Sequence, residues 1–167
     1  TLVAEIDAPE PIGPLVFVNH FQSAHVAREF ERERQALAAA RFIEELVADH
    51  DRHVILAGDL NAGPEAASVR FLTGRQSLDG MSVCYLNAWD RTHPGEPGHT
   101  FSPRSPLVAE AHRDWPYQRL DHILLRFGEG ESPSLDITRC DVAFDEPVNG
   151  VWPSDHFALV ADFSVPE

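Results

Sequence analysis

The chain has 167 residues, of which 43% are hydrophobic and 24% charged, which is typical of a single soluble globular domain and excludes disordered, collagen-like and coiled-coil chains. No apolar run approaches the roughly 20 residues of a membrane-spanning helix, so no membrane span is expected. A formal charge of −14 disfavours tight nonspecific binding to nucleic acid, but leaves room for a local basic patch or for a cation that bridges to phosphate.

The first half of the chain predicts a β-hairpin followed by a βαβ unit. Short apolar strands are expected at Leu2–Ile6 and Leu15–Asn19, joined by a turn-rich connection with three prolines and a glycine. A 3.6-residue apolar stripe predicts a long helix from Ser23, as its N-cap, to about Asp49. The unbroken apolar run His53–Gly58 is typical of a buried strand, so at least one parallel pair is expected.

The second half is richer in loops. A short helix is predicted from Pro64 to Leu72, and residues 77–105 are expected to be mostly loop. Further strands are predicted at Leu120–Arg126, Ile137–Phe144 and Phe157–Val165. Helices that alternate with apolar strands indicate an α/β fold with a mixed sheet and a helical cover.

Other features carry weaker signals. Cys84 and Cys140 have neither a disulfide framework nor zinc-type spacing and are interpreted as buried thiols. The alternating charges of Arg28–Arg34 predict a solvated helix face. Trp115 and its neighbours in the loops are either anchors on the core or rings that stack on a base or sugar. No targeting segment is visible; the compartment is open, with the cytoplasm slightly favoured.

Polar residues gather at four predicted strand ends. These are Asn19-His20, Gly58–Asn61, Arg119–His122 and Ser154–His156. Each alone is more often a turn or a structural residue, but α/β folds place their sites at strand ends, so all four could converge on one pocket.

Together they suit phosphoester hydrolysis. Carboxylates hold a divalent cation that neutralises phosphate charge, and an aspartate can orient or deprotonate the attacking water. An asparagine amide can donate to a phosphate oxygen. A histidine held by a second carboxylate keeps one tautomer and can stabilise developing charge.

The ordered motifs Asn-His, Gly-Asp-Leu-Asn, Arg-Leu-Asp-His-Ile and Ser-Asp-His-Phe resemble the endonuclease/exonuclease/phosphatase superfamily. The resemblance covers the second half of the family's domain. It implies part of a four-layer α/β sandwich, with residues 1–167 forming a single domain that is incomplete at its N-terminus.

The resemblance also implies roles for individual residues. Asp59 would activate or orient the nucleophilic water, and Asn61 would bind the scissile phosphate. His156 would contact a non-bridging oxygen, with Asp121 as its carboxylate partner. His20 would be a second histidine on the phosphate.

A Mg²⁺ or Mn²⁺ ion is the implied cofactor. Asp155 would lie on or near this metal, with Asp59 and Asn61 as further ligands. Thr100 matches a weaker family position near the substrate, and Arg104 could touch substrate phosphate.

One departure limits this interpretation. The family's first half carries a Gln-Glu pair whose glutamate is a principal metal ligand, and this chain has no counterpart. We therefore expect weak metal binding, an apolar face left open, and a preceding segment or an oligomer partner that completes the sandwich. The expected function is a divalent-metal-dependent phosphoesterase, either a nuclease or a phosphatase of small or lipid phosphates. The alternative is an inactive fragment or a scaffold domain that retains the fold.

Overall fold

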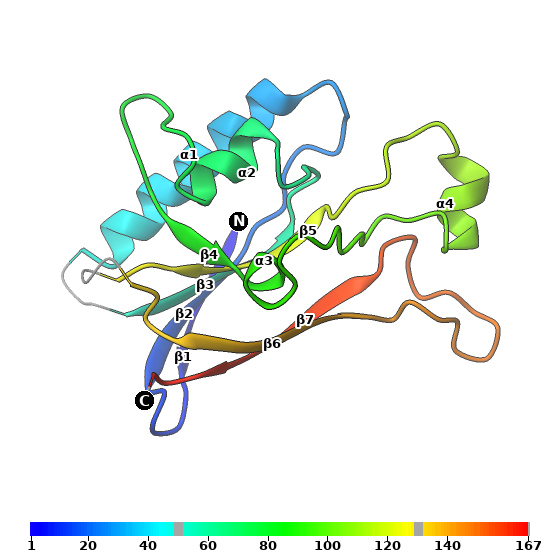
Figure 1. Ribbon diagram of the computed structural model, residues 1–167. Coiled ribbons are helices and arrows are strands. Elements are labelled where there is room, and N and C mark those ends of the chain that lie inside the picture. Colours follow the sequence, from blue (N-terminus) through cyan, green and yellow to red (C-terminus); the bar gives the residue numbers. More distant parts are fainter. Residues whose placement is uncertain (49–51, 129–131, 167) are drawn as a thin grey trace.

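The computed structural model describes residues 1–48, 52–128 and 132–166 as two β-sheets with helices packed against them (Figure 1). The strands are β1 (Leu2–Asp7), β2 (Pro14–Asn19), β3 (His53–Asp59), β4 (Tyr85–Asn87), β5 (Asp121–Arg126), β6 (Asp136–Ala143) and β7 (Ala158–Ser164). The helices are α1 (Glu29–Leu46), α2 (Ala67–Leu72), α3 (Ala88–Thr92) and α4 (Pro106–Ala111). The larger sheet has the order β1-β2-β3-β5-β4, and β6 pairs with β7.

The pairing of the first strands confirms the predicted hairpin and βαβ unit. β1 runs antiparallel to β2, with Leu2 opposite Asn19. β2 and β3 are parallel and are connected through α1. The next neighbour of β3 is β5, which runs antiparallel and sets Asp59 opposite Asp121. This last pairing positions the site described below.

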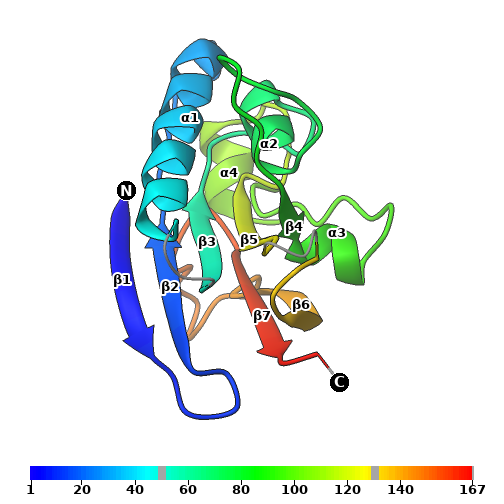
Figure 2. The ribbon, with the colours of Figure 1, turned by 90° about the vertical axis from the view of Figure 1, so that its left-hand side faces the viewer.

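The layers are helices, large sheet and small sheet. Figures 1 and 2 show α1 and α2 over one face of the large sheet, with β6 and β7 on the other side. On the helical side, Ala36 and Ile43 of α1 pack on Val16 and Leu56 in one fully buried cluster. These observations confirm a mixed α/β fold.

The small sheet covers part of the opposite face. Its cluster includes Ile55 and Leu125 from the large sheet and the buried Cys140, as predicted for that thiol. Cys84 is exposed, so its prediction as a buried thiol is wrong. A hollow of about 410 Å³ remains between the sheets, with Phe17 and Phe163 in its lining.

Helix α1 begins at Glu29 and not at Ser23, because Arg32 holds the preceding residues in a loop. The Arg32 side chain is only 5% exposed, so the predicted solvated face is wrong at this residue. Its guanidinium donates to the carbonyls of Ser23 and His25 at 3.0 and 2.8 Å, and to that of Val26. These bonds satisfy carbonyls that a helix would pair internally. The predicted helix end at Asp49 lies outside the described residues.

Arg32→Met is expected to lower the free energy of unfolding by roughly 3 kcal/mol, because it leaves the loop carbonyls and the Glu29 carboxylate without their buried partner. Urea unfolding followed by circular dichroism measures this. Arg34→Met, at an exposed position of the same helix, is the matched control and should change stability by less than about 0.5 kcal/mol. Equal effects of the two substitutions would contradict the assigned role of Arg32.

Two elements, β4 and α3, lie within residues 77–105, which the sequence analysis expected to be mostly loop, and α4 follows directly after that stretch, where no element was predicted. Each is six residues or fewer, and tertiary contacts define it. The Asn87 side chain caps α3 by accepting from the backbone N–H groups of Trp89 and Asp90. Trp89 is buried in the core. Among the helices of the described segments, none is long and apolar enough to cross a membrane.

Candidate functional site

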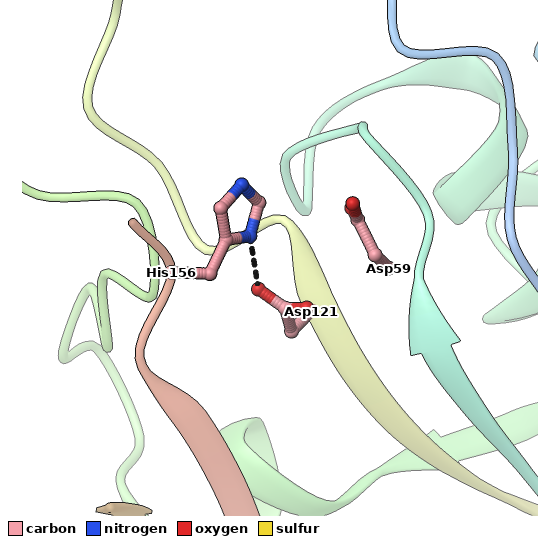
Figure 3. A group of neighbouring side chains, drawn as sticks. All are labelled: Asp59, Asp121 and His156. Atoms are coloured by element: carbon pink, nitrogen blue, oxygen red, sulfur yellow. Dashed lines mark hydrogen bonds and ion pairs between the residues drawn. The ribbon is translucent and has the colours of Figure 1, made fainter. Parts of the chain in front are cut away.

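Three ionisable side chains meet where β3 ends and β5 begins. The antiparallel register sets Asp59 opposite Asp121, and the loop before β7 brings in His156. Their ligand atoms all lie within 4.8 Å of one another, and all three residues are partly buried. Figure 3 shows Asp59 facing the pair formed by Asp121 and His156. The structure thus brings together three of the residues that the sequence analysis selected.

His156 is held in one orientation. Its Nδ1 lies 2.9 Å from Asp121 Oδ2 (Figure 3), so Nδ1–H donates to the carboxylate and Nε2 remains to face a ligand. Burial lowers the pKa of His156, but the hydrogen bond and charge of Asp121, with the charge of Asp59, outweigh it and raise the pKa overall. The ring of Phe101 packs against His156 with centroids 5.2 Å apart. The protonated imidazolium is therefore favoured beside these carboxylates.

Asp59 and Asn61 form a compact turn. Asp59 accepts from the backbone N–H of Asn61 at 2.8 Å and from its side-chain amide at 3.2 Å. Asn61 adopts the left-handed region, with φ of 49°, which asparagine tolerates better than most residues. Burial raises the pKa of Asp59, and the charge of Asp121 adds to this. A carboxylate held in this way gains from a nearby cation.

The Asn61 amide has both hydrogens engaged. Its second bond goes to the backbone carbonyl of Gln22 at 3.0 Å. The side-chain oxygen of Asn61 is therefore the atom that it can offer without breaking a bond. To donate to a phosphate, as the sequence analysis expects, Asn61 must release Asp59 or Gln22.

Gly58 allows the close approach of His20, the residue that follows β2, to this turn. A Cβ at this position would lie 2.3 Å from the backbone oxygen of His20, so only glycine fits without a shift of the backbone. The backbone N–H of Gln22 donates to the Asp59 carbonyl at 3.1 Å beside it. The turn is thus fixed to the chain that follows β2.

Asp155 lies near the group of Asp59, Asp121 and His156. Within the described part of the chain, this group does not include Asp155. It is partly buried, and Ser154 Oγ donates to it at 3.3 Å. Its charge raises the pKa of both Asp59 and His156. A metal-ligand role for Asp155 remains a prediction.

The other predicted substrate contacts have different surroundings. His20 is buried, bonded to Thr1 and Gln22, and burial lowers its pKa to about 4. Thr100 is fully buried, and its hydroxyl accepts from the backbone N–H of Leu120 and Asp121. Both side chains therefore have partners within the fold, and their contact with substrate stays a prediction.

Arg104 lies on the surface, in an ion pair with Asp145 at 2.7 Å. Its side chain is 63% exposed, and its guanidinium lies over the ring of Phe157. The contact of Arg104 with substrate stays a prediction.

The ion pair of His156 makes stability depend on pH. Because the pKa of His156 is raised in the folded state, protonated His156 stabilises the fold. This stabilisation is fully present below the unfolded-state pKa of about 6.5 and is lost as pH rises through the folded-state pKa. In chelator-treated protein, His156→Asn should therefore cost more free energy of unfolding at pH 6 than at pH 9. Urea titrations at both values measure the difference. An equal cost, or a larger cost at pH 9, would contradict the assigned pair.

Comparison with known proteins identifies the class of protein that carries this arrangement. The model of the Endonuclease/Exonuclease/phosphatase family matches residues 2–156, and the chain belongs to this family. A search of curated proteins found no match.

Solved structures share the fold at low sequence identity. The catalytic domain of human Nocturnin is 18% identical with a TM-score of 0.70, over 98% of this chain and 52% of that one. D. rerio TDP2 complexed with single-strand DNA product is 21% identical with a TM-score of 0.69, over 98% and 60%. A mannosyl-6-phosphatase from Bacteroides thetaiotaomicron is 19% identical with a TM-score of 0.60, over 90% and 51%. The chain therefore spans between about half and three-fifths of these proteins.

Proposed function

We propose that the protein hydrolyses a phosphoester with the help of a divalent cation. One observation carries this proposal: the pairing of β3 with β5 and the loop before β7 gather ligand atoms of Asp59, Asp121 and His156 within 4.8 Å of one another. Two carboxylates this close, one of them with a raised pKa, suit a bound cation.

The donor set fits Mg²⁺ or Mn²⁺, which prefer oxygen ligands. Asp59 would hold the ion, with the side-chain oxygen of Asn61 and the carboxylate of Asp155 as nearby ligands. When bound, such an ion neutralises phosphate charge and polarises the ester. Because few carboxylates lie within reach of the ion, we expect a dissociation constant for the metal on the order of 1 mM.

The side chains have separable tasks. Asp59 orients the attacking water and accepts its proton. His156, kept protonated by Asp121, donates from Nε2 to a non-bridging phosphate oxygen and stabilises the charge that develops there. Asn61 keeps Asp59 in place through its two bonds to that carboxylate. In-line attack then depends mainly on positioning.

The substrate class within this proposal is a phosphodiester or a phosphomonoester. The D. rerio relative was solved with a DNA product and the Bacteroides relative is a sugar-phosphate phosphatase, so the family likeness fits both. The alternative remains that this chain is inactive alone, as a fragment or a scaffold. Its basis is the partial span of the solved relatives, of which the chain covers 52% and 60%.

Hydrolysis of bis(p-nitrophenyl) phosphate and p-nitrophenyl phosphate tests the proposal. We expect release of nitrophenolate with Mn²⁺ or Mg²⁺, abolished by a chelator and restored by excess metal. Preference for one of the two probes separates diesterase from monoesterase. Absence of metal-dependent release of either product would favour the inactive alternative.

A small groove beside Asn61 provides a test of substrate contact. It has a volume of about 150 Å³ and is lined by Phe101, Trp115 and Leu120, among others. Trp115 is 40% exposed, and its ring packs at an angle of 49° against that of His112, with centroids 4.6 Å apart.

Trp115→Ala is expected to raise KM roughly 5- to 150-fold for an aromatic phosphodiester, since stacking on one ring is worth about 1–3 kcal/mol. kcat should change little. Steady-state kinetics measures both, with Tyr117→Phe as the control. An unchanged KM would assign Trp115 to packing only.

A further inference from the structure

His122 occupies a position that the roles above do not use. It follows Asp121 on β5 and is 1% exposed. Alternation along the strand turns it to the opposite face from Asp121. Both ring nitrogens have partners, Nε2 at 2.9 Å from the Ala62 carbonyl and Nδ1 at 3.1 Å from the side-chain amide of Asn87.

These partners fix the tautomer. A carbonyl can only accept, so the proton of the neutral ring lies on Nε2 and Nδ1 accepts from Asn87. The Asn87 amide is itself fixed, because its oxygen caps α3 by accepting from Trp89 and Asp90. A directed series of hydrogen bonds therefore runs from the N-terminus of α3 through Asn87 and His122 to Ala62.

Ala62 ends the turn that carries Asp59 and Asn61. On the side of β5, the backbone N–H of Leu60 also donates to the Leu120 carbonyl at 2.9 Å, while Asp59 and Asn61 bond to Gln22 on the other side. Together the bonds of Ala62 and Leu60 tie both halves of the turn to residues 120–122. They hold Asp59 on one side and Asp121 on the other at the spacing observed.

We propose that His122 is a positioning residue, which fixes the turn 59–62 relative to Asp121 and His156 through the Ala62 carbonyl. The inference deepens the proposed function and rests on it for its catalytic consequence. A histidine that only filled space in the core would act through its volume. A positioning histidine acts through the donor on Nε2.

Two substitutions that introduce side chains of similar shape separate these roles. His122→Gln introduces an amide that can donate to the Ala62 carbonyl, and His122→Met introduces a side chain shaped like glutamine that has no donor. We expect Met to weaken Mn²⁺ binding, measured by electron paramagnetic resonance, by about 10- to 100-fold, and to lower kcat while KM changes less. Gln should restore both to within about threefold of the wild type.

A second readout is independent of activity. In ¹H–¹⁵N spectra, the amide resonances of Leu60 and Asn61 should move in His122→Met and stay near their wild-type positions in His122→Gln. If His122→Met does not fold, His122→Asn replaces it, because its shorter amide cannot reach Ala62.

The outcomes distinguish the two proposals. Equal spectra and equal Mn²⁺ affinities for Gln and Met would overturn the positioning role. A wild-type protein that neither binds Mn²⁺ nor hydrolyses either phosphate probe would overturn the proposed function, whereas the spectra would still decide the role of His122.

Discussion

Asp59→Asn is expected to lower metal-dependent phosphoester hydrolysis by about 10²- to 10⁴-fold, because it removes the proton acceptor for water and a ligand of the cation. The substitution keeps the shape of the side chain. Because burial raises the pKa of Asp59, its ionised form costs the folded state free energy, and loss of this charge should leave stability at pH 7 unchanged or increased. Initial rates and urea unfolding of one preparation measure both effects.

Asp79→Asn is the matched control. This carboxylate is 70% exposed and pairs with Arg41 on the surface, so its substitution should leave the rate unchanged. A full rate in Asp59→Asn would refute the assigned centre. A reduced rate accompanied by unfolding would show that Asp59 acts on the fold and not on the chemistry.

The second large effect is expected at the pair of Asp121 and His156. His156→Gln should lower kcat by about 10²- to 10³-fold, because a neutral amide replaces the cation that stabilises the phosphate. Asp121→Asn should give a loss of similar size, since the imidazole loses the carboxylate that orients and charges it.

A double-mutant cycle shows whether the two residues act together. The double variant should be little worse than the worse single variant, because each substitution removes the same interaction. Initial rates at saturating metal give the coupling. Strictly multiplicative losses would contradict a functional pair between Asp121 and His156.

The sequence predicts the fold best where long-range packing agrees with local patterns. The apolar run of β3 and the amphipathic stripe of α1 indicate buried elements; β3 is present close to its expected bounds, whereas α1 begins later than expected. The start of α1 could not be predicted, because it depends on bonds from Arg32 to a loop nine residues earlier. Similarly, β4 is three residues long and is stabilised by its pairing with β5.

The sequence predicts which residues form the site better than it predicts how they are arranged in space. Asp59, Asp121 and His156 were selected from their motifs, but only the pairing of β3 with β5 and the position of the loop before β7 show that they meet. The position of a histidine at a strand end did not indicate whether its side chain lies in the site. His20 is buried and bonded to Thr1 and Gln22, while His122, to which the sequence analysis gave no role of its own, bonds to Ala62 in the turn beside Asp59.

Localised binding of Mn²⁺ tests the central claim most directly. In a titration of the ¹⁵N-labelled protein, paramagnetic broadening should first affect the amides of Leu60, Asn61 and His156, and added Mg²⁺ should reverse it. Asp59→Asn should abolish this selectivity, whereas Asp79→Asn should retain it. Broadening that spreads evenly over the acidic surface, or that is unchanged in Asp59→Asn, would contradict a cation site at the ends of β3 and β5.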